Sequence, residues 1–375
     1  MTLWCHKICY ALGEKEKQIV TTMNEKDKNP IRGRGASDNP ANRFEGRYTD
    51  YDLDEDSGEK PSQETKLIRD DTKEILSKND SPDIPFTYGL NPYRGCEHGC
   101  IYCYARPTHE FLGFSAGLDF ESRIMVKYDA ADKLRTKFAD KNWKPEPITL
   151  SGVTDPYQPV ERELEITRSC LEIFAEARNP VGIITKNYLV TRDIELLKEL
   201  SQYNAVHVTL SITTLDRDLA RVMEPRTSQP YRRLKAIEKL AENDISVGVN
   251  VAPIIPGLTD HECPGILKEA RNAGATHAGY TIVRLPYGVK DLFTEWLAQH
   301  FPDRKEKVLN RIRDMRGGKL YESEFGKRFT GEGEFYSQIK SMFKIHVEKY
   351  GFNQSPLSLS REHFQRPEKG QLTLF

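Results

Sequence analysis

Three cysteines, Cys96, Cys100 and Cys103, fall within eight residues of this chain in the spacing C-x3-C-x2-C. Gly95 and Gly99 precede the first two and allow the unusual backbone turns of a tight loop. Three thiolates on one loop can ligate three irons of a cubane iron–sulfur cluster, which leaves the fourth iron without a protein ligand. Because an iron with an open position can bind a small molecule, the spacing predicts a catalytic cluster.

A structural zinc site is the alternative interpretation of the same loop, with His98 as the fourth ligand. Zinc sites usually pair their ligands in two separated elements that close a tetrahedron. The single compact loop departs from that pattern. We therefore expect iron, and we expect His98 to be a loop residue that hydrogen-bonds a neighbouring carbonyl or sulfur.

The elements that must position this loop are short apolar runs that alternate with helical patterns, as in repeated βα units around a parallel sheet. This predicts an α/β fold, a partial (β/α)6 barrel of the TIM type. The expected strands are Phe86–Leu90, Ile148–Ser151, Val181–Thr185, Val206–Ile212, Ser246–Ala252 and Ala278–Arg284. The expected helices are Glu163–Ala177, Asp193–Leu200, Gln229–Asn243 and Glu262–Ala273, the last opened by a Thr259/Glu262 capping box.

Polar side chains occur where these strands end, which is where the active sites of such barrels lie. The candidates for binding a cofactor are Ser151, Thr154, Asp155, Lys186, Ser211 and Asn250. Each also has a structural interpretation. Asp155 can cap a proline-rich turn, Lys186 can be solvated, and Asn250 can be a satisfied interior amide.

The cysteine spacing, with the aromatic Tyr102 before the last cysteine, resembles the radical S-adenosylmethionine (SAM) superfamily. That resemblance implies a [4Fe–4S] cluster whose open iron chelates SAM, and reductive cleavage of SAM to a 5′-deoxyadenosyl radical. It also implies an electron donor such as flavodoxin or ferredoxin. Tyr102 is expected to lie against the adenine, because a ring face is a broad stacking partner.

Residues 86–290 resemble one branch of that superfamily, which includes spore photoproduct lyase and its DNA-repair-photolyase-like relatives. This implies that Lys186 and Ser211 bind SAM and that Tyr104 takes part in hydrogen transfer. Gly152 stands where the lyase has a hydrogen-donating cysteine. Repair of spore photoproduct itself is therefore not expected, and the hydrogen donor is open. Cys263 is one remaining candidate.

Length and composition suit one large catalytic domain with extensions. The chain has 375 residues, 38% apolar and 30% charged, with a net charge of −1. No apolar run approaches the ~20 residues needed to span a membrane, and seven cysteines with three clustered do not resemble a disulfide framework. We expect a cytoplasmic protein. A nucleic-acid role would have to rest on local patches, such as the expected helix Asp303–Lys319 with its local charge of +4.

Four regions are expected along the chain. Residues 1–80 are polar and expected to be largely disordered, and translation starts at Met1 or Met23. Residues 81–290 form the catalytic core, 291–350 a helical extension, and 351–375 a mobile tail. The tail ends in a peptide, Gln371, Leu372, Thr373, Leu374 and Phe375, that resembles the motif by which bacterial repair proteins dock on the sliding clamp. Folding of the tail onto its own domain is the alternative.

The leading functional hypothesis is a radical SAM enzyme that repairs or modifies nucleic acid. A radical SAM enzyme acting on a protein or small molecule is the second. A non-catalytic iron–sulfur accessory protein of the replication machinery is the third.

Overall fold

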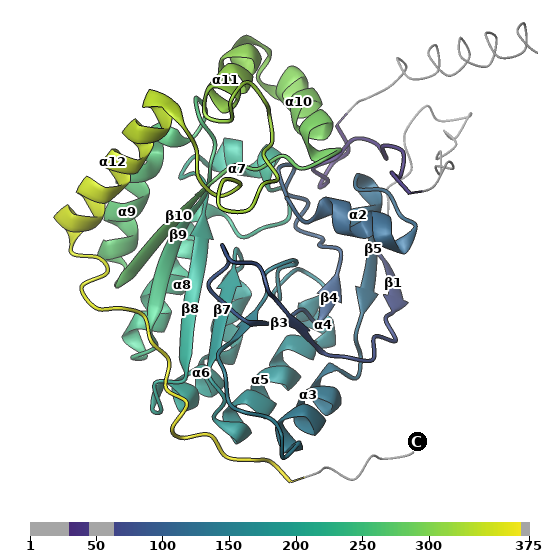
Figure 1. Cartoon of the computed structure of the whole chain (residues 1–375), viewed down its shortest axis with the longest axis vertical. Helices are drawn as coiled ribbons and strands as arrows, with labels where there is room; N and C mark the ends of the chain where they lie inside the picture. Colours follow the sequence, from purple (N-terminus) through teal and green to yellow (C-terminus); the bar gives the residue numbers. More distant parts are fainter. Residues whose placement is uncertain (1–29, 45–63, 369–375) are drawn as a thin grey trace, which may run out of the picture.

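A seven-stranded sheet forms the centre of the molecule in the computed structural model, which describes residues 30–44 and 64–368 (Figure 1). Its order is β10-β9-β8-β7-β6-β3-β2, and all neighbours are parallel except the edge pair β2 and β3. The strands are β2 Leu76–Lys78, β3 Tyr88–Leu90, β6 Ile148–Leu150, β7 Val181–Thr185, β8 Val206–Ile212, β9 Val247–Ile254 and β10 His277–Ile282. All six expected strands are present, and the α/β partial barrel is confirmed. The antiparallel edge strand β2 was not expected.

Helices cover the outer side of this sheet (Figure 1). They include α3 Ala130–Ala139, α5 Ile166–Ala177, α6 Ile194–Ser201, α8 Pro230–Glu242 and α9 Cys263–Asn272. The expected helix Glu163–Ala177 is broken at Glu165, which has φ +52° and separates α4 (Glu161–Leu164) from α5. The expected capping box is wrong. The Glu262 carboxylate accepts hydrogen bonds from the Thr214 hydroxyl and the Leu215 amide.

The two faces of the sheet carry different residues. Toward the helices, paired positions on successive strands are aliphatic and buried: Leu90, Leu150, Ile183, Val208 and Val247. Toward the barrel interior, one row of paired positions holds Ser77, Gly89, Thr149, Gly182 and His207. TIM-type barrels usually fill this interior with large branched side chains. The small and polar interior here leaves space, since a Cβ added at Gly182 would meet nothing within 4 Å.

A second, three-stranded sheet supports the back of the cysteine loop. Its strands are β1 Lys66–Arg69, β5 Arg123–Val126 and β4 Tyr93–Arg94, in the order β1-β5-β4. The short helix α2 (Leu118–Ser122) leads into β5.

Part of the region expected to be disordered packs against that loop. The backbone amides of Gly35 and Ala36 donate to the Glu121 carboxylate at 3.0 and 2.9 Å. A Cβ at Gly35 would lie 1.7 Å from the carbonyl oxygen of Gly99, so the close contact requires glycine. The expectation of disorder is therefore wrong for residues 30–44 and 64–80, while 1–29 and 45–63 lie outside the described residues.

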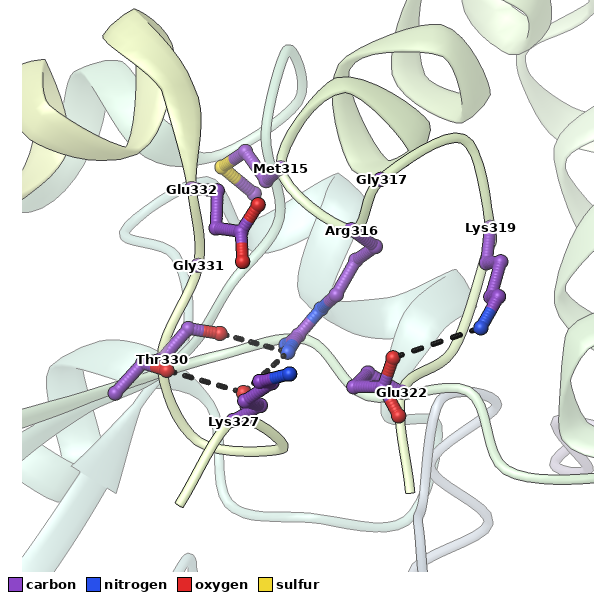
Figure 2. A pocket seen from close by; sticks show the side chains of 9 residues that line it. All are labelled: Met315, Arg316, Gly317, Lys319, Glu322, Lys327, Thr330, Gly331 and Glu332. Carbon is purple, nitrogen blue, oxygen red and sulfur yellow. Dashed lines mark hydrogen bonds and ion pairs between the residues drawn. The ribbon is translucent and has the colours of Figure 1, made fainter. Parts of the chain in front are cut away.

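Three helices follow the barrel: α10 Val289–His300, α11 Pro302–Asp314 and α12 Gly333–Tyr350. The basic helix expected to reach Lys319 ends at Asp314. Figure 2 shows Arg316 turned into the loop that follows, where its guanidinium donates to the carbonyls of Lys327 and Thr330, the latter at 2.7 Å. Arg316 is therefore a structural group of the loop.

Residues 353–366 cross the amino-terminal ends of the strands, in place of the mobile tail expected from 351 onward. Figure 1 shows this segment in yellow, running from α12 along the bottom of the view. The Asn353 side chain exchanges two hydrogen bonds with the backbone of Ala278 on β10. At the other end of the segment, Arg366 donates to the carbonyl of Phe138 at 2.9 Å. Within the described ranges, no helix is long and apolar enough to cross a membrane.

Candidate functional site

The cysteine loop follows β3 and is held from both sides. The Cys96 amide donates to the carbonyl of Phe120 at 2.9 Å, and the Ile101 amide donates to Met223 at 3.1 Å. Gly95 has φ +81°, and an added Cβ there would lie 2.9 Å from the His109 ring. The expected glycine turn at this position is thus confirmed.

Glu97 ties the loop to the segment after β6. Its carboxylate accepts from the Val160 amide at 2.7 Å and pairs with Arg226 at 2.9 Å, while its own amide donates to the Gln158 side chain. Because these contacts come from distant segments, they fix the conformation of the loop that carries the thiols.

The three thiols lie together on this loop in a largely buried environment. Cys96 and Cys100 are buried and Cys103 is half-buried, and all three are free. Burial raises the pKa of each thiol, and at Cys96 the neighbouring Cys100 and Cys103 raise it further. The mutual influence shows that the sulfurs share one small region.

Three cations surround these thiols. Arg106 is fully buried, donates to the Cys100 carbonyl at 3.0 Å and pairs with Glu121. The positive charges of Arg106 and Lys186 oppose the effect of burial on the pKa of Cys103, and Lys186 and Arg233 do so at Cys100. The Glu224 carboxylate, which pairs with Lys186 and Arg233, acts in the opposite direction and raises the pKa of Cys100. A desolvated pocket with three free thiols fits an iron–sulfur cluster held by thiolates.

The alternative zinc site with His98 has no support in this geometry. His98 contacts Asp155 through Nδ1 at 3.4 Å and Asn187 through Nε2 at 3.1 Å, so both ring nitrogens are engaged. His98 does hydrogen-bond its neighbours, but its partners are the Asp155 carboxylate and the Asn187 side-chain amide in place of the expected carbonyl or sulfur.

A buried polar cluster adjoins the cysteine loop and centres on Glu224. The Tyr102 hydroxyl donates to Glu224 and lies 3.2 Å from the Thr213 hydroxyl. Lys186 Nζ lies 3.2 Å from the Glu224 carboxylate and donates to Thr213 at 3.0 Å. Arg233 pairs with the other Glu224 oxygen, and both side chains are fully buried. This cluster fixes the positions of Tyr102 and Lys186 beside Cys100.

Opposing effects set the charge state of Glu224. Burial acts to raise its pKa, but the charges of Arg233 and Lys186 and hydrogen bonds from Thr213 and Tyr102 bring the pKa below its ordinary value. Glu224 is therefore ionised throughout the physiological pH range.

Ser211 and Asn250 lie directly opposite each other on β8 and β9, on the same face of the sheet as His207. Thr213 lies two residues after Ser211, directly beyond the end of β8. Thr213 contacts Tyr102 and Lys186. The predicted residues Ser211 and Asn250 therefore lie on the wall of the site.

Three other predicted residues are occupied by contacts within the protein. The Ser151 hydroxyl donates to the Thr154 carbonyl at 2.9 Å, and the Thr154 hydroxyl donates to the Tyr93 carbonyl at 2.8 Å. Asp155 accepts from the Tyr157 amide, the Thr185 hydroxyl and the Lys186 amide. These side chains hold the loop after β6 in place, which is the structural interpretation of Asp155.

Tyr104 is half-exposed at the mouth of the barrel, and its hydroxyl donates to the Gly152 carbonyl. Gly152 has φ +111°, a conformation that L side chains rarely adopt. Cys263, the remaining thiol candidate, is fully buried at the start of α9. Arg284, which follows β10, lies 4.6 Å over the Tyr104 ring. No motif or spacing in the sequence marked Arg284 as a site residue.

The model of the radical SAM superfamily matches residues 90–270, which span the cysteine loop and the sheet through α9. The chain belongs to the radical SAM superfamily. An uncharacterized protein of Mycobacterium tuberculosis (strain ATCC 25618 / H37Rv) is 35% identical over 234 residues, covering 62% of this chain and 68% of that protein. The radical SAM Nalpha-GlyT isomerase of Pseudomonas phage M6 is 26% identical over 224 residues, covering 59% of this chain and 44% of that enzyme.

A solved structure of a spore photoproduct lyase variant with bound AdoMet and dinucleoside spore photoproduct shares the fold. Its TM-score is 0.53 at 17% identity, over 76% of this chain and 80% of that chain. For a radical SAM protein, SAM and an iron–sulfur cluster are the implied cofactors. The free thiols and surrounding cations of this chain fit such a cluster.

Sequence reasoning missed one residue of this radical SAM site and did not single out another. Arg233 lies inside the amphipathic α8 and has no local signal, although it is fully buried against Glu224. Glu224 follows α7 (Arg217–Met223), and by sequence it was only one of several charged residues in that stretch.

Proposed function

We propose that this radical SAM protein holds a [4Fe–4S] cluster on Cys96, Cys100 and Cys103 and acts on nucleic acid. The observation that carries the cluster assignment is the set of three free thiols on one loop, ringed by Arg106, Lys186 and Arg233. When bound, the cluster and SAM together supply a 5′-deoxyadenosyl radical that abstracts hydrogen from the substrate. Three free thiols persist in the reducing cytoplasm, where we propose that the enzyme works.

The chain's own residues divide into those that bind SAM and those that position them. Lys186 is 15% exposed and offers a point charge for the SAM carboxylate, while Ser211 and Asn250 line the adjoining wall. Tyr102 is placed next to Lys186, whose Nζ lies 5.7 Å from its ring centroid. Glu224 and Arg233 are positioning residues, because they hold Tyr102 and Lys186 without facing the barrel mouth.

The substrate assignment rests on the lyase-like branch and on the barrel mouth. Tyr104 is a hydrogen-transfer candidate at the edge of the site, and Arg284 beside it adds positive charge. Within residues 30–44 and 64–368, Arg284 forms no ion pair, so its charge is available to an anionic group such as a phosphate. The small and polar residues of the barrel interior, with open space beside Gly182, are compatible with a base that enters the site.

A label-transfer experiment tests this function. We expect anaerobic protein with SAM, dithionite and a panel of lesion-bearing and unmodified oligonucleotides to exchange deuterium between one oligonucleotide and 5′-deoxyadenosine. Mass spectrometry of both products detects the transfer. Exchange with a peptide or small metabolite but with no oligonucleotide would favour the second candidate, a protein or small-molecule substrate.

We also propose that the carboxyl-terminal peptide docks on a bacterial sliding clamp, while the electron donor is a flavodoxin or ferredoxin. Gln371, Leu372, Leu374 and Phe375 lie outside the described residues. Arg366, five residues earlier, is anchored on the carbonyls of Phe138, Asp140 and Trp143 at the end of the barrel away from Tyr104. A peptide that starts there can reach a partner while the barrel mouth stays open.

Deleting residues 371–375 tests the clamp proposal. We expect the full chain to bind purified clamp in surface plasmon resonance and the truncated chain to lose binding by at least about tenfold, because the apolar anchor residues dominate such short docking peptides. A doubly substituted peptide, Leu374→Ala with Phe375→Ala, should have the same effect. Unchanged binding of the truncated chain would refute the proposal.

A further inference from the structure

Aromatic rings and arginines at the barrel mouth form two groups of contacts. The rings of Phe111 and Phe44 lie 4.9 Å apart, and the Arg43 guanidinium lies 4.9 Å from Phe44. The same guanidinium lies 3.7 Å over the ring of Tyr287. These four residues come from three separate segments, all at the carboxyl-terminal side of the barrel.

The second group includes Tyr104 and the loop that follows α11. Arg284 lies 4.2 Å over the ring of Phe329 on one side and 4.6 Å over Tyr104 on the other. Arg328 pairs with Asp83 at 2.6 Å and so fastens this loop beside the barrel. We call Phe111, Phe44, Arg43, Tyr287, Arg284 and Phe329 the arginine–aromatic track.

The rings of this track are available to a partner. Phe111 is 71% exposed, Phe44 57% and Tyr287 51%, although large aromatic side chains usually bury most of their surface. Tyr287 also has φ +50°, a backbone conformation that costs a bulky residue free energy and is retained mainly at functional positions. The Arg43 charge is engaged by Glu110 at 2.6 Å, so in this track Arg43 contributes chiefly the flat face of its guanidinium.

We propose that the arginine–aromatic track is a docking surface for single-stranded nucleic acid, which leads unstacked bases past its rings to Tyr104 and the site. Aromatic rings and guanidinium planes stack on bases of any sequence, and this is how single strands are held without base-specific hydrogen bonds. The proposal rests on the nucleic-acid substrate class proposed above and adds the strand state and the binding surface.

A duplex fits this surface less well, because its bases are stacked on one another and offer the rings no free faces. The charge of the chain also favours binding through unstacked bases. With a net charge of −1 and one arginine of the track already paired, attraction to phosphates is small, and stacking must supply most of the binding free energy.

The test is fluorescence anisotropy of a labelled single-stranded oligonucleotide with the full chain and with the double variant Phe44→Ala/Phe111→Ala. We expect the variant to bind about tenfold more weakly or worse, since each stacked base contributes roughly a factor of five or more. The wild type should prefer the single strand to the matching duplex. Its log K should also fall only shallowly with log salt, with a slope of about −0.7, because Arg284 alone of the track's arginines is left to neutralise a phosphate.

The matched control is Tyr231→Ala on α8. Tyr231 is 54% exposed and has Arg217 at 5.9 Å over its ring, but it lies outside the track. We expect the affinity of this variant for the single strand to change by less than twofold. Equal binding by wild type and double variant, preference for duplex, or absence of single-strand binding by the wild type would each overturn the proposal.

An acidic peptide is the competing occupant. If a peptide of residues 50–56 bound the track with the same dependence on Phe44 and Phe111 and displaced the oligonucleotide, the track would be a peptide site. A different result would refute the proposed function. Track-dependent binding of single strands without any deuterium exchange would leave the docking surface standing and remove the nucleic-acid substrate.

Discussion

Replacing Cys100 with alanine is expected to abolish cluster assembly and reduce 5′-deoxyadenosine formation to background. Cys100 is buried on the loop between two other free thiols, and the positive charges of Lys186 and Arg233 act on it. With two thiolates left, the loop cannot hold three irons. Iron and sulfide analysis after anaerobic reconstitution, with chromatographic detection of 5′-deoxyadenosine, checks both parts.

The matched control is Cys170→Ala. Cys170 is fully buried in α5, so this change also removes a buried thiol but leaves the loop intact. We expect wild-type iron content and SAM cleavage, with only a small loss of stability. Full iron content in the Cys100 variant, or an equal loss in both variants, would argue against the assigned ligand.

Replacing Glu224 with glutamine is expected to cause the second large effect, a loss of roughly 3–5 kcal/mol in the free energy of unfolding. The change leaves the fully buried Arg233 without its carboxylate partner and also removes the ion pair of Lys186. Chemical denaturation of the two proteins measures the difference. SAM binding should weaken as well, because Lys186 and Tyr102 lose the group that holds them.

An exposed ion pair provides the control for this substitution. Glu238 pairs with Lys235 on the surface of α8, and Glu238→Gln should cost well under about 1 kcal/mol. A Glu224 variant as stable as the Glu238 variant would show that the buried cluster contributes little to the free energy of unfolding.

The pH dependence of the Glu224 effect follows from its lowered pKa. The folded-state pKa lies below the unfolded value of about 4.3, so the ionised carboxylate contributes stability above that value and loses the contribution as pH falls through the folded pKa. The stability difference between wild type and Glu224→Gln should therefore shrink below about pH 4. A difference that grows with acidification would have the wrong sign.

The sequence predicted the elements whose signals are local. The six parallel strands have short runs rich in apolar residues, and Val181–Thr185 and Val206–Ile212 match residue for residue. The cysteine spacing predicted the loop, and Gly95 confirmed its turn. The fold and the proposed cluster ligands follow from patterns that short stretches of chain carry by themselves.

Long-range contacts were beyond that kind of prediction. Nothing around Gly35 indicates that its amide would meet Glu121, 86 residues away, because the segment is polar and lacks periodicity. In the sequence, Arg233 is an ordinary charged residue of an amphipathic helix. Only the packing of α8 places it against Glu224. Ser151 and Thr154 have the hydroxyls that a ligand requires, but backbone carbonyls accept their hydrogen bonds.

The most direct test of the central claim is the reaction of anaerobically reconstituted wild-type protein with SAM and dithionite. We expect about four irons per chain, with methionine and 5′-deoxyadenosine forming only in the reduced sample. A protein that contains one zinc and no iron, or that binds iron and releases no 5′-deoxyadenosine on reduction, would contradict the account.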